Sequence, residues 1–111
     1  MNFSIDVQNE VIKIKILLTH LTGKDSPELR QLIDDKLQAG YNKFVVDLSL
    51  VVFMDSTFLG SLVSALKKIS GIGGKLILAS VTDEVRSIIE NTGTSNIFSV
   101  CEDVDAAIKL T

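Results

Sequence analysis

Apolar and polar residues alternate in the first part of the chain, over residues 3–7 and again over residues 12–18. Asn9-Glu10 forms a short polar break between the two runs. A period of two interrupted by such a break is typical of two antiparallel strands joined in a hairpin. Lys13 and Lys15 predict that one face of the second strand lies at least partly in solvent.

The segment after this hairpin begins with a helix-start signal. Ser26 is a residue type that caps helices, Pro27 suits the first helical position, and Glu28 favours the positive end of the helix dipole. One helical face then gathers the apolar residues Leu29, Leu32, Ile33 and Leu37. We therefore predict a helix that Ser26 caps and Gly40 ends.

Downstream of Gly40, apolar runs of strand length alternate with segments of helical spacing. The pattern predicts strands over residues 44–48, 75–79 and 97–100, and helices after Asp55, after Thr82 and over residues 103–110. The run over residues 44–48 is nearly continuous, which is typical of a central strand covered on one or both faces. Glycines at positions 71, 73 and 74 end the helix that follows Asp55.

This order of elements, β-β-α-β-α-β-α-β-α, predicts an α/β fold. Strands that alternate with helices form parallel sheets through right-handed crossovers, and the N-terminal hairpin adds an antiparallel strand at one edge. We expect one domain over residues 1–111, with a mixed, mostly parallel sheet of about five strands and about four helices.

Composition and charge restrict the classes of function and the cellular location expected for this chain. Hydrophobic residues make up 46% of the chain and charged residues 23%, so a packed core is expected. The net charge is −3 and the basic residues are scattered, which argues against direct nucleic-acid binding. Charged residues interrupt every apolar stretch, and the N-terminus lacks the pattern of a signal peptide, so we expect a cytoplasmic protein without membrane insertion. A single cysteine, Cys101, fits a reducing compartment.

Catalytic and metal-binding patterns find little support. His20, Asp55 and Ser56 could be imagined as a triad, but Met54 and Phe58 occupy the glycine positions of the Gly-x-Ser-x-Gly pattern of hydrolases. The glycines at 71–74 follow a helix and precede a strand, the reverse of a phosphate-binding loop. One histidine and one cysteine, with dispersed carboxylates, predict no metal site and no cofactor. We predict no catalytic residue.

Asp55-Ser56-Thr57 lies where an apolar strand gives way to a helix. If Asp55 caps that helix, Ser56 lies in its first turn, where backbone N–H groups lack partners and the dipole favours negative charge. A phosphate on Ser56 would meet those donors and add roughly two negative charges beside Asp55. The same three residues are also explained fully as an ordinary helix cap, and both interpretations stay open on these residues alone.

Residues 53–60, Phe-Met-Asp-Ser-Thr-Phe-Leu-Gly, together with the element order, resemble the STAS domain family, specifically the bacterial anti-sigma factor antagonists. The family signature is an apolar strand followed by Asp-Ser-x-Gly-Leu-Gly at a helix start, and the resemblance spans nearly the whole chain. It implies a switch and no enzyme activity. The unphosphorylated antagonist binds an anti-sigma factor that is also a serine kinase, which frees a sigma factor, and phosphorylation abolishes that binding.

Carried over by position, the resemblance makes Ser56 the phosphorylated residue and Thr57 a weaker candidate. The partner-binding residues expected from it are Met54, Asp55, Ser56, Thr57, Phe58, Leu59, Gly60, Val63 and Ser64.

Two positions depart from the family pattern. Phe58 replaces the first glycine of the motif, so this side chain either fills the core or projects and changes which partner docks. The family's Gly-x-x-Asp turn after the second strand reads Thr19-His20-Leu21-Thr22 here, without a carboxylate, and the side chains of His20 and Thr22 could offer substitute hydrogen bonds. These departures leave open an alternative, a STAS adaptor of a transporter or lipid-trafficking assembly that works without phosphorylation and uses Phe58 as an apolar contact. No phosphate-loop motif supports a third possibility, nucleotide binding near Asp55.

Overall fold

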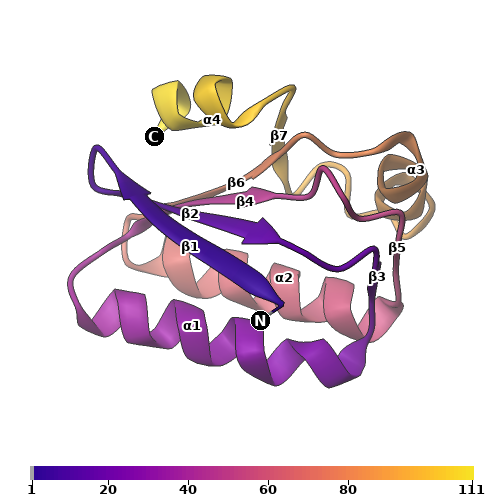
Figure 1. Cartoon of the computed structure of the whole chain (residues 1–111), viewed down its shortest axis with the longest axis horizontal. Coiled ribbons are helices and arrows are strands. Elements are labelled where there is room, and N and C mark those ends of the chain that lie inside the picture. The colour runs from indigo at the N-terminus through magenta and orange to yellow at the C-terminus, as the bar shows by residue number, and fades with distance from the viewer. Residues whose placement is uncertain (1) are drawn as a thin grey trace.

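The computed structural model describes residues 2–111, and its centre is a five-stranded sheet in the spatial order β1-β2-β4-β6-β7 (Figure 1). β1 pairs with β2 in antiparallel fashion, and all other neighbours in this sheet are parallel. This arrangement confirms the predicted α/β class and the antiparallel strand at the edge. The strands are β1 (Phe3–Gln8), β2 (Val11–Ile16), β4 (Lys43–Asp47), β6 (Lys75–Ala79) and β7 (Ser99–Cys101). β7 is shorter than the strand predicted over residues 97–100 and begins two residues later.

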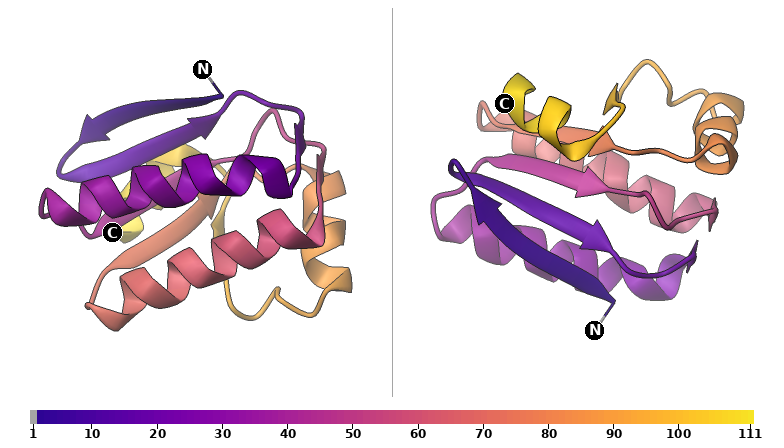
Figure 2. Two further views of the ribbon diagram at one scale, coloured as in Figure 1. Left: turned by 90° about the horizontal axis from the view of Figure 1, so that it is seen from below. Right: turned by 45° about the horizontal axis from the view of Figure 1, so that its top comes forward.

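Helices cover both faces of the sheet. α1 (Ser26–Gln38) and α2 (Ser56–Gly71) lie side by side on one face, and α4 (Val104–Leu110) lies on the other (Figures 1 and 2). α3 (Asp83–Asn91) follows β6 and stands at the end of the sheet where α2 begins. Side chains alternate along the central strands, so each face of the sheet has its own core. Val46 packs toward α1 and α2, whereas Val45 packs with Ala107 of α4.

The turns at the two ends of α1 differ in how well the sequence predicted them. Gly40 ends the helix as predicted, with φ of +99°, a conformation that glycine adopts without strain. The predicted capping role of Ser26 is wrong. A short 3₁₀ turn, η1 (Gly23–Asp25), precedes the helix, and Asp25 occupies the cap position. Ser26 is therefore the first helical residue, and its hydroxyl is buried without a hydrogen-bond partner within residues 2–111.

A second, very small parallel sheet connects the main sheet to the N-termini of both long helices. β3 (His20–Leu21) follows β2 and leads to η1, and β5 (Phe53–Met54) follows β4 and leads to α2. Figure 1 shows the two strands side by side at the end of the molecule where both helices begin. The sequence pattern did not predict this pair, which holds the β2–α1 connection against the start of α2.

Candidate functional site

Backbone hydrogen bonds between the β3 and β5 segments position the residues that lead into α2. The N–H groups of Val52 and Phe53 both donate to the Thr19 carbonyl, at 2.8 and 3.2 Å. The Asp55 N–H then donates to the Leu21 carbonyl at 3.0 Å. These backbone contacts hold Asp55 against the segment that precedes α1.

Asp55 caps α2, as predicted. One carboxylate oxygen, Oδ1, accepts the N–H of Phe58 at 2.8 Å, and the Asp55 carbonyl accepts the N–H of Leu59 at 3.1 Å. The other oxygen, Oδ2, accepts the N–H of Gly23 at 3.1 Å, from a residue 32 positions earlier. Asp55 therefore both starts the helix and ties it to the turn before α1.

Gly23, in the turn before α1, is the partner of the second Asp55 carboxylate oxygen. The hydrogen bond to Asp55 comes from its backbone, and not from the side chain of Thr22 or His20 as considered above. Gly23 also lies against α2 so closely that an added Cβ would stand 2.8 Å from the methyl carbon Cγ2 of Thr57. Sequence reasoning did not identify this glycine, because only the three-dimensional contact reveals its role.

The turn that carries Gly23 is held by its own pair of hydrogen bonds. The Asp25 carboxylate accepts the N–H of Thr22 at 3.0 Å, and the Thr22 carbonyl accepts the N–H of Asp25 at 2.9 Å. Asp25 is 5% exposed, so this reciprocal pair is shielded from water. The carboxylate of this turn thus stabilises the turn itself, while Asp55 makes the bridge to α2.

Ser56 is the first residue of α2, and its side chain is exposed. Within residues 2–111, the backbone N–H groups of Ser56 and Thr57 have no hydrogen-bond partner, as expected for the first turn of a helix. The hydroxyl of Ser56 is not hydrogen bonded to Asp55 or His20 among these residues. No nucleophile-base pair is therefore formed, whereas two unpaired donors lie at the positive end of the helix dipole.

His20 is exposed at the surface and does not form a catalytic triad with Asp55 and Ser56. Its ring nitrogen Nδ1 lies 3.0 Å from the hydroxyl oxygen of Thr19. The imidazole packs near Phe53, with the ring centroids 6.0 Å apart. Phe53 is 42% exposed, and the preceding Val52 and Leu50 are 36% and 43% exposed. These residues give the edge of the molecule just before Ser56 an apolar surface that the sequence prediction did not include.

The residues predicted to bind a partner separate into two groups. Met54, Phe58 and Leu59 are at most 3% exposed, so their side chains cannot contact a partner in this conformation. Burial resolves the question about Phe58, which fills the core between the sheet and α2. The side chains that remain accessible are those of Ser56, Thr57 and Ser64, with Gly60 exposed and with Asp55 and Val63 half-buried.

The segment before Ser56 is also fastened to α3. The hydroxyl of Thr82, the cap of α3, donates to the Val51 carbonyl at 2.7 Å and accepts the N–H of Val85 at 3.3 Å.

Within residues 2–111, no group of three potential metal ligands comes together, and no helix has the length and apolar character to cross a membrane. The exposed Ser56 and the unpaired N–H groups beside it make the start of α2 the candidate site.

Comparison with known proteins shows the family and the fold of the chain. The STAS domain family matches residues 5–107. An anti-sigma-B factor antagonist of Staphylococcus aureus is 32% identical over 105 residues, which cover 95% of this chain and 96% of the relative. A solved Thermotoga maritima protein, assigned to the anti-sigma factor antagonists, has a TM-score of 0.84 at 27% identity and covers 96% of this chain and 92% of its own. The Bacillus cell-fate determinant SpoIIAA, solved in its phosphorylated form, shares the fold with a TM-score of 0.74 at 17% identity, covering 98% and 99% of the two chains.

Proposed function

Because the chain belongs to the STAS domain family and is related over nearly its whole length to the anti-sigma factor antagonists, which are non-enzymatic regulators, we propose that Ser56 is a phosphorylation switch for partner binding. The unphosphorylated protein binds an anti-sigma factor with serine kinase activity in the cytoplasm and thereby releases a sigma factor. Phosphorylation of Ser56 ends that binding.

The observation that carries this proposal is the exposed Ser56 hydroxyl beside two unpaired backbone N–H groups. A phosphate on this oxygen carries about −1.5 to −2 charges at neutral pH and several acceptor oxygens. The free N–H groups of Ser56 and Thr57 are the kind of donors that hold a phosphate at a helix N-terminus. The modified side chain is therefore accommodated without unfolding α2.

The same phosphate changes the surface that a partner meets. Asp55 already uses its two carboxylate oxygens for the N–H groups of Phe58 and Gly23, so it stays in place as a neighbouring negative charge. The apolar side chains of Val52 and Phe53 belong to the segment that leads into Ser56. Burying a doubly charged group at the edge of such a surface is costly unless the partner pairs it. Loss of docking with retention of the fold is the expected result.

The test uses the purified serine kinase anti-sigma factor from the same genome, with ATP and the wild-type chain. Mass spectrometry should find one phosphate, on Ser56. The Ser56→Ala variant should bind the unmodified partner within about threefold of wild type but accept no phosphate. Ser56→Asp should bind at least tenfold more weakly, about 1.4 kcal/mol. Ser70→Ala, at an exposed serine near the other end of α2, is the matched control and should behave as wild type in both assays.

Three results would count against the switch. Phosphate on Thr57 alone would move the site by one residue. Full binding by Ser56→Asp would remove the electrostatic mechanism. Binding with no modification of either residue would instead favour a STAS adaptor that works without phosphorylation.

A further inference from the structure

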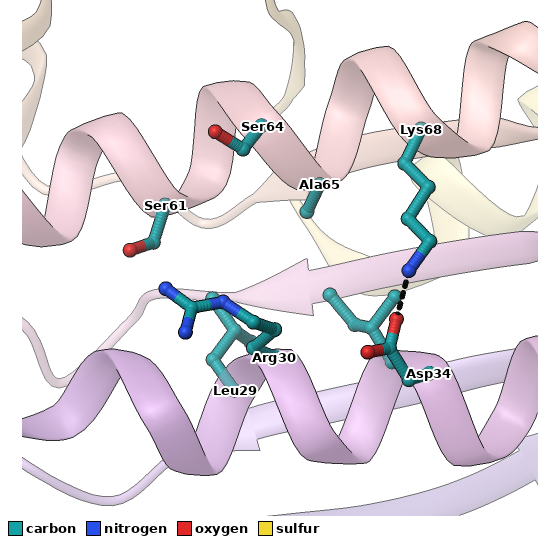
Figure 3. A pocket seen from close by; sticks show the side chains of 8 residues that line it. Leu29, Arg30, Asp34, Ser61, Ser64, Ala65 and Lys68 are labelled. Carbon is teal, nitrogen blue, oxygen red and sulfur yellow. Dashed lines mark hydrogen bonds and ion pairs between the residues drawn. The ribbon is translucent and has the colours of Figure 1, made fainter.

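A groove runs between α1 and α2 on the side of the molecule away from the sheet (Figure 3). Its volume is about 130 Å³. Leu29 and Ile33 of α1 contribute apolar surface to it, although both side chains are at most 2% exposed. The groove exists because α2 faces α1 there with short side chains, Ser61, Ser64 and Ala65, which leave the space between the helices unfilled.

Charged side chains stand at the two ends of this groove, and only one end is neutralised. Lys68 of α2 and Asp34 of α1 form an ion pair across one end. Toward the other end, Figure 3 shows the guanidinium of Arg30 reaching from α1 toward Ser61. Within residues 2–111, no carboxylate or other acceptor pairs with Arg30. The groove is therefore apolar, with one uncompensated positive charge at its rim.

The size of the groove restricts its occupant. Sites for drug-sized ligands and cofactors have volumes of roughly 300–1,000 Å³. A cavity of about 150 Å³ holds a single benzene ring. The 130 Å³ between α1 and α2 therefore matches one bulky side chain and not a nucleotide or a whole lipid. An interface pocket that receives one apolar anchor is typical of the residues that dominate protein–protein affinity.

The groove is also close enough to Ser56 to belong to the same interface. Ser61 lies five residues after Ser56 on α2, about 7.5 Å along the helix axis at 1.5 Å per residue. An ordinary protein interface covers about 800 Å² of each partner, which spans such a distance easily. Ser64, eight residues after Ser56, is turned about 80° from it around the helix, so a docked protein that covers Ser56 and extends along α2 toward α1 reaches the groove.

We propose that this groove receives one bulky apolar side chain of the anti-sigma factor, and that a carboxylate next to that side chain on the partner pairs with Arg30. The proposal rests on the proposed function for the identity of the partner. The apolar surface, the volume and the free guanidinium give the chemistry of the anchor. Because Arg30 is exposed, its pairing is expected to contribute through steering and orientation as well as affinity.

The test measures the dissociation constant for the purified serine kinase anti-sigma factor, with two independent changes to the groove. Ala65→Leu fills the groove with a residue of similar helix propensity, and Arg30→Glu reverses the charge. Each should weaken binding at least tenfold, while Arg30→Lys should stay within about fivefold of wild type. Ala39→Leu and Arg86→Glu are matched controls, on an exposed residue after α1 and an exposed residue of α3, and should bind within about twofold.

Photo-crosslinking identifies the occupant. A benzoylphenylalanine at position 67, an exposed residue of α2 three positions after Ser64 and outside the groove lining, should capture a partner peptide that contains a bulky apolar residue beside Asp or Glu. Capture of a second copy of this chain, or of a partner peptide without a carboxylate, would overturn the proposal. Thermal unfolding of every variant confirms that the fold persists.

The two proposals fail in different ways. If Ala65→Leu and Arg30→Glu bind as wild type while Ser56→Asp loses binding, the groove proposal is wrong and the switch stands. If the groove variants lose binding and Ser56→Asp does not, the switch is wrong and the groove stands. If the wild-type chain does not bind the kinase at all, both are wrong.

Discussion

The contact between Gly23 and Thr57 gives the sharpest test of how the candidate site is built. A Cβ on residue 23 would lie 2.8 Å from Cγ2 of Thr57 and 3.1 Å from its Cβ. The first distance is too short for two carbon atoms, so Gly23→Ala must displace the Thr57 side chain, the turn that carries residue 23 or the first turn of α2. The turn of residue 23 also carries the N–H group that donates to Asp55. The substitution should therefore disturb the site through one added methyl group.

Opposing effects set the size of the change. Overpacking by one carbon in a close contact costs about 1–3 kcal/mol. Gly23 has no positive φ, so alanine also lowers the entropy of the unfolded chain, which stabilises the protein by about 0.4–1 kcal/mol. The net loss expected for Gly23→Ala is about 1–2 kcal/mol. In a Thr57→Ser background the 2.8 Å contact is gone, and the same change should be nearly neutral.

The assay is a double-mutant cycle of urea unfolding with Gly23→Ala, Thr57→Ser and the double variant. The expected coupling free energy is about 1–2 kcal/mol, which is a difference that such cycles resolve. Gly60→Ala is the control for a glycine replacement in open space. Nothing lies within 4 Å of its added Cβ, and the change should stabilise α2 by about 0.5–1 kcal/mol. Hydrogen exchange of the residue 23 amide should quicken in Gly23→Ala and recover in the double variant. Additive effects of the two changes, within about 0.3 kcal/mol, would refute the close contact.

Three further predictions concern the core, the start of α1 and the surface. Phe58→Ala should lower the free energy of unfolding by about 3–5 kcal/mol, because the side chain is fully buried, and a loss below 1 kcal/mol in denaturant titration would contradict its place in the core. Ser26→Ala should raise the free energy of unfolding by about 1 kcal/mol by removing a buried hydroxyl without a partner, and a loss of stability would show that this hydroxyl is satisfied. The hydrogen bond from Lys13 and its charge lower the pKa of Asp6, so Lys13→Met should raise that pKa in a carboxyl NMR titration. The stabilisation from this lowered pKa is present above the ordinary pKa of Asp and disappears as pH falls through the folded-state pKa, and an unchanged pKa in Lys13→Met would exclude the pairing.

Hydrophobic periodicity predicted the helices and strands that bury a continuous apolar run or an apolar face of their own. The strand over residues 75–79 was predicted with the bounds that the structure has, because its apolar run is bordered by glycine and by polar residues. The β3–β5 pair could not be predicted in this way. Each strand has two residues, and their pairing depends on N–H and carbonyl groups from segments more than 30 positions apart in the sequence.

For Phe58, the family pattern and the local helical spacing favour different environments. The family pattern, which has glycine at this position, raised the possibility of a projecting side chain. Phe58, Leu62 and Ile69 are spaced four and seven residues apart, which puts them on one helical stripe, and the structure buries all three. Local periodicity gave the better answer because a fully apolar side chain on a stripe that faces the sheet gains more from burial than from exposure.

The two hydrogen bonds of the Asp55 carboxylate explain why the sequence predicted where the candidate site lies but not all of its contacts. A cap preference depends on one residue and its own helix, so Asp55 and the first turn were predictable. The second oxygen of the same carboxylate reaches Gly23, and no local pattern encodes a partner 32 positions away that contributes only a backbone N–H. Each Asp55 oxygen accepts one backbone N–H, so the carboxylate is held in place by the fold and offers only its remaining lone pairs to a docking protein. The groups at this site that can still respond to a phosphate are the N–H groups of Ser56 and Thr57, which is why the switch is expected to depend on position 56 itself more than on the residues around it.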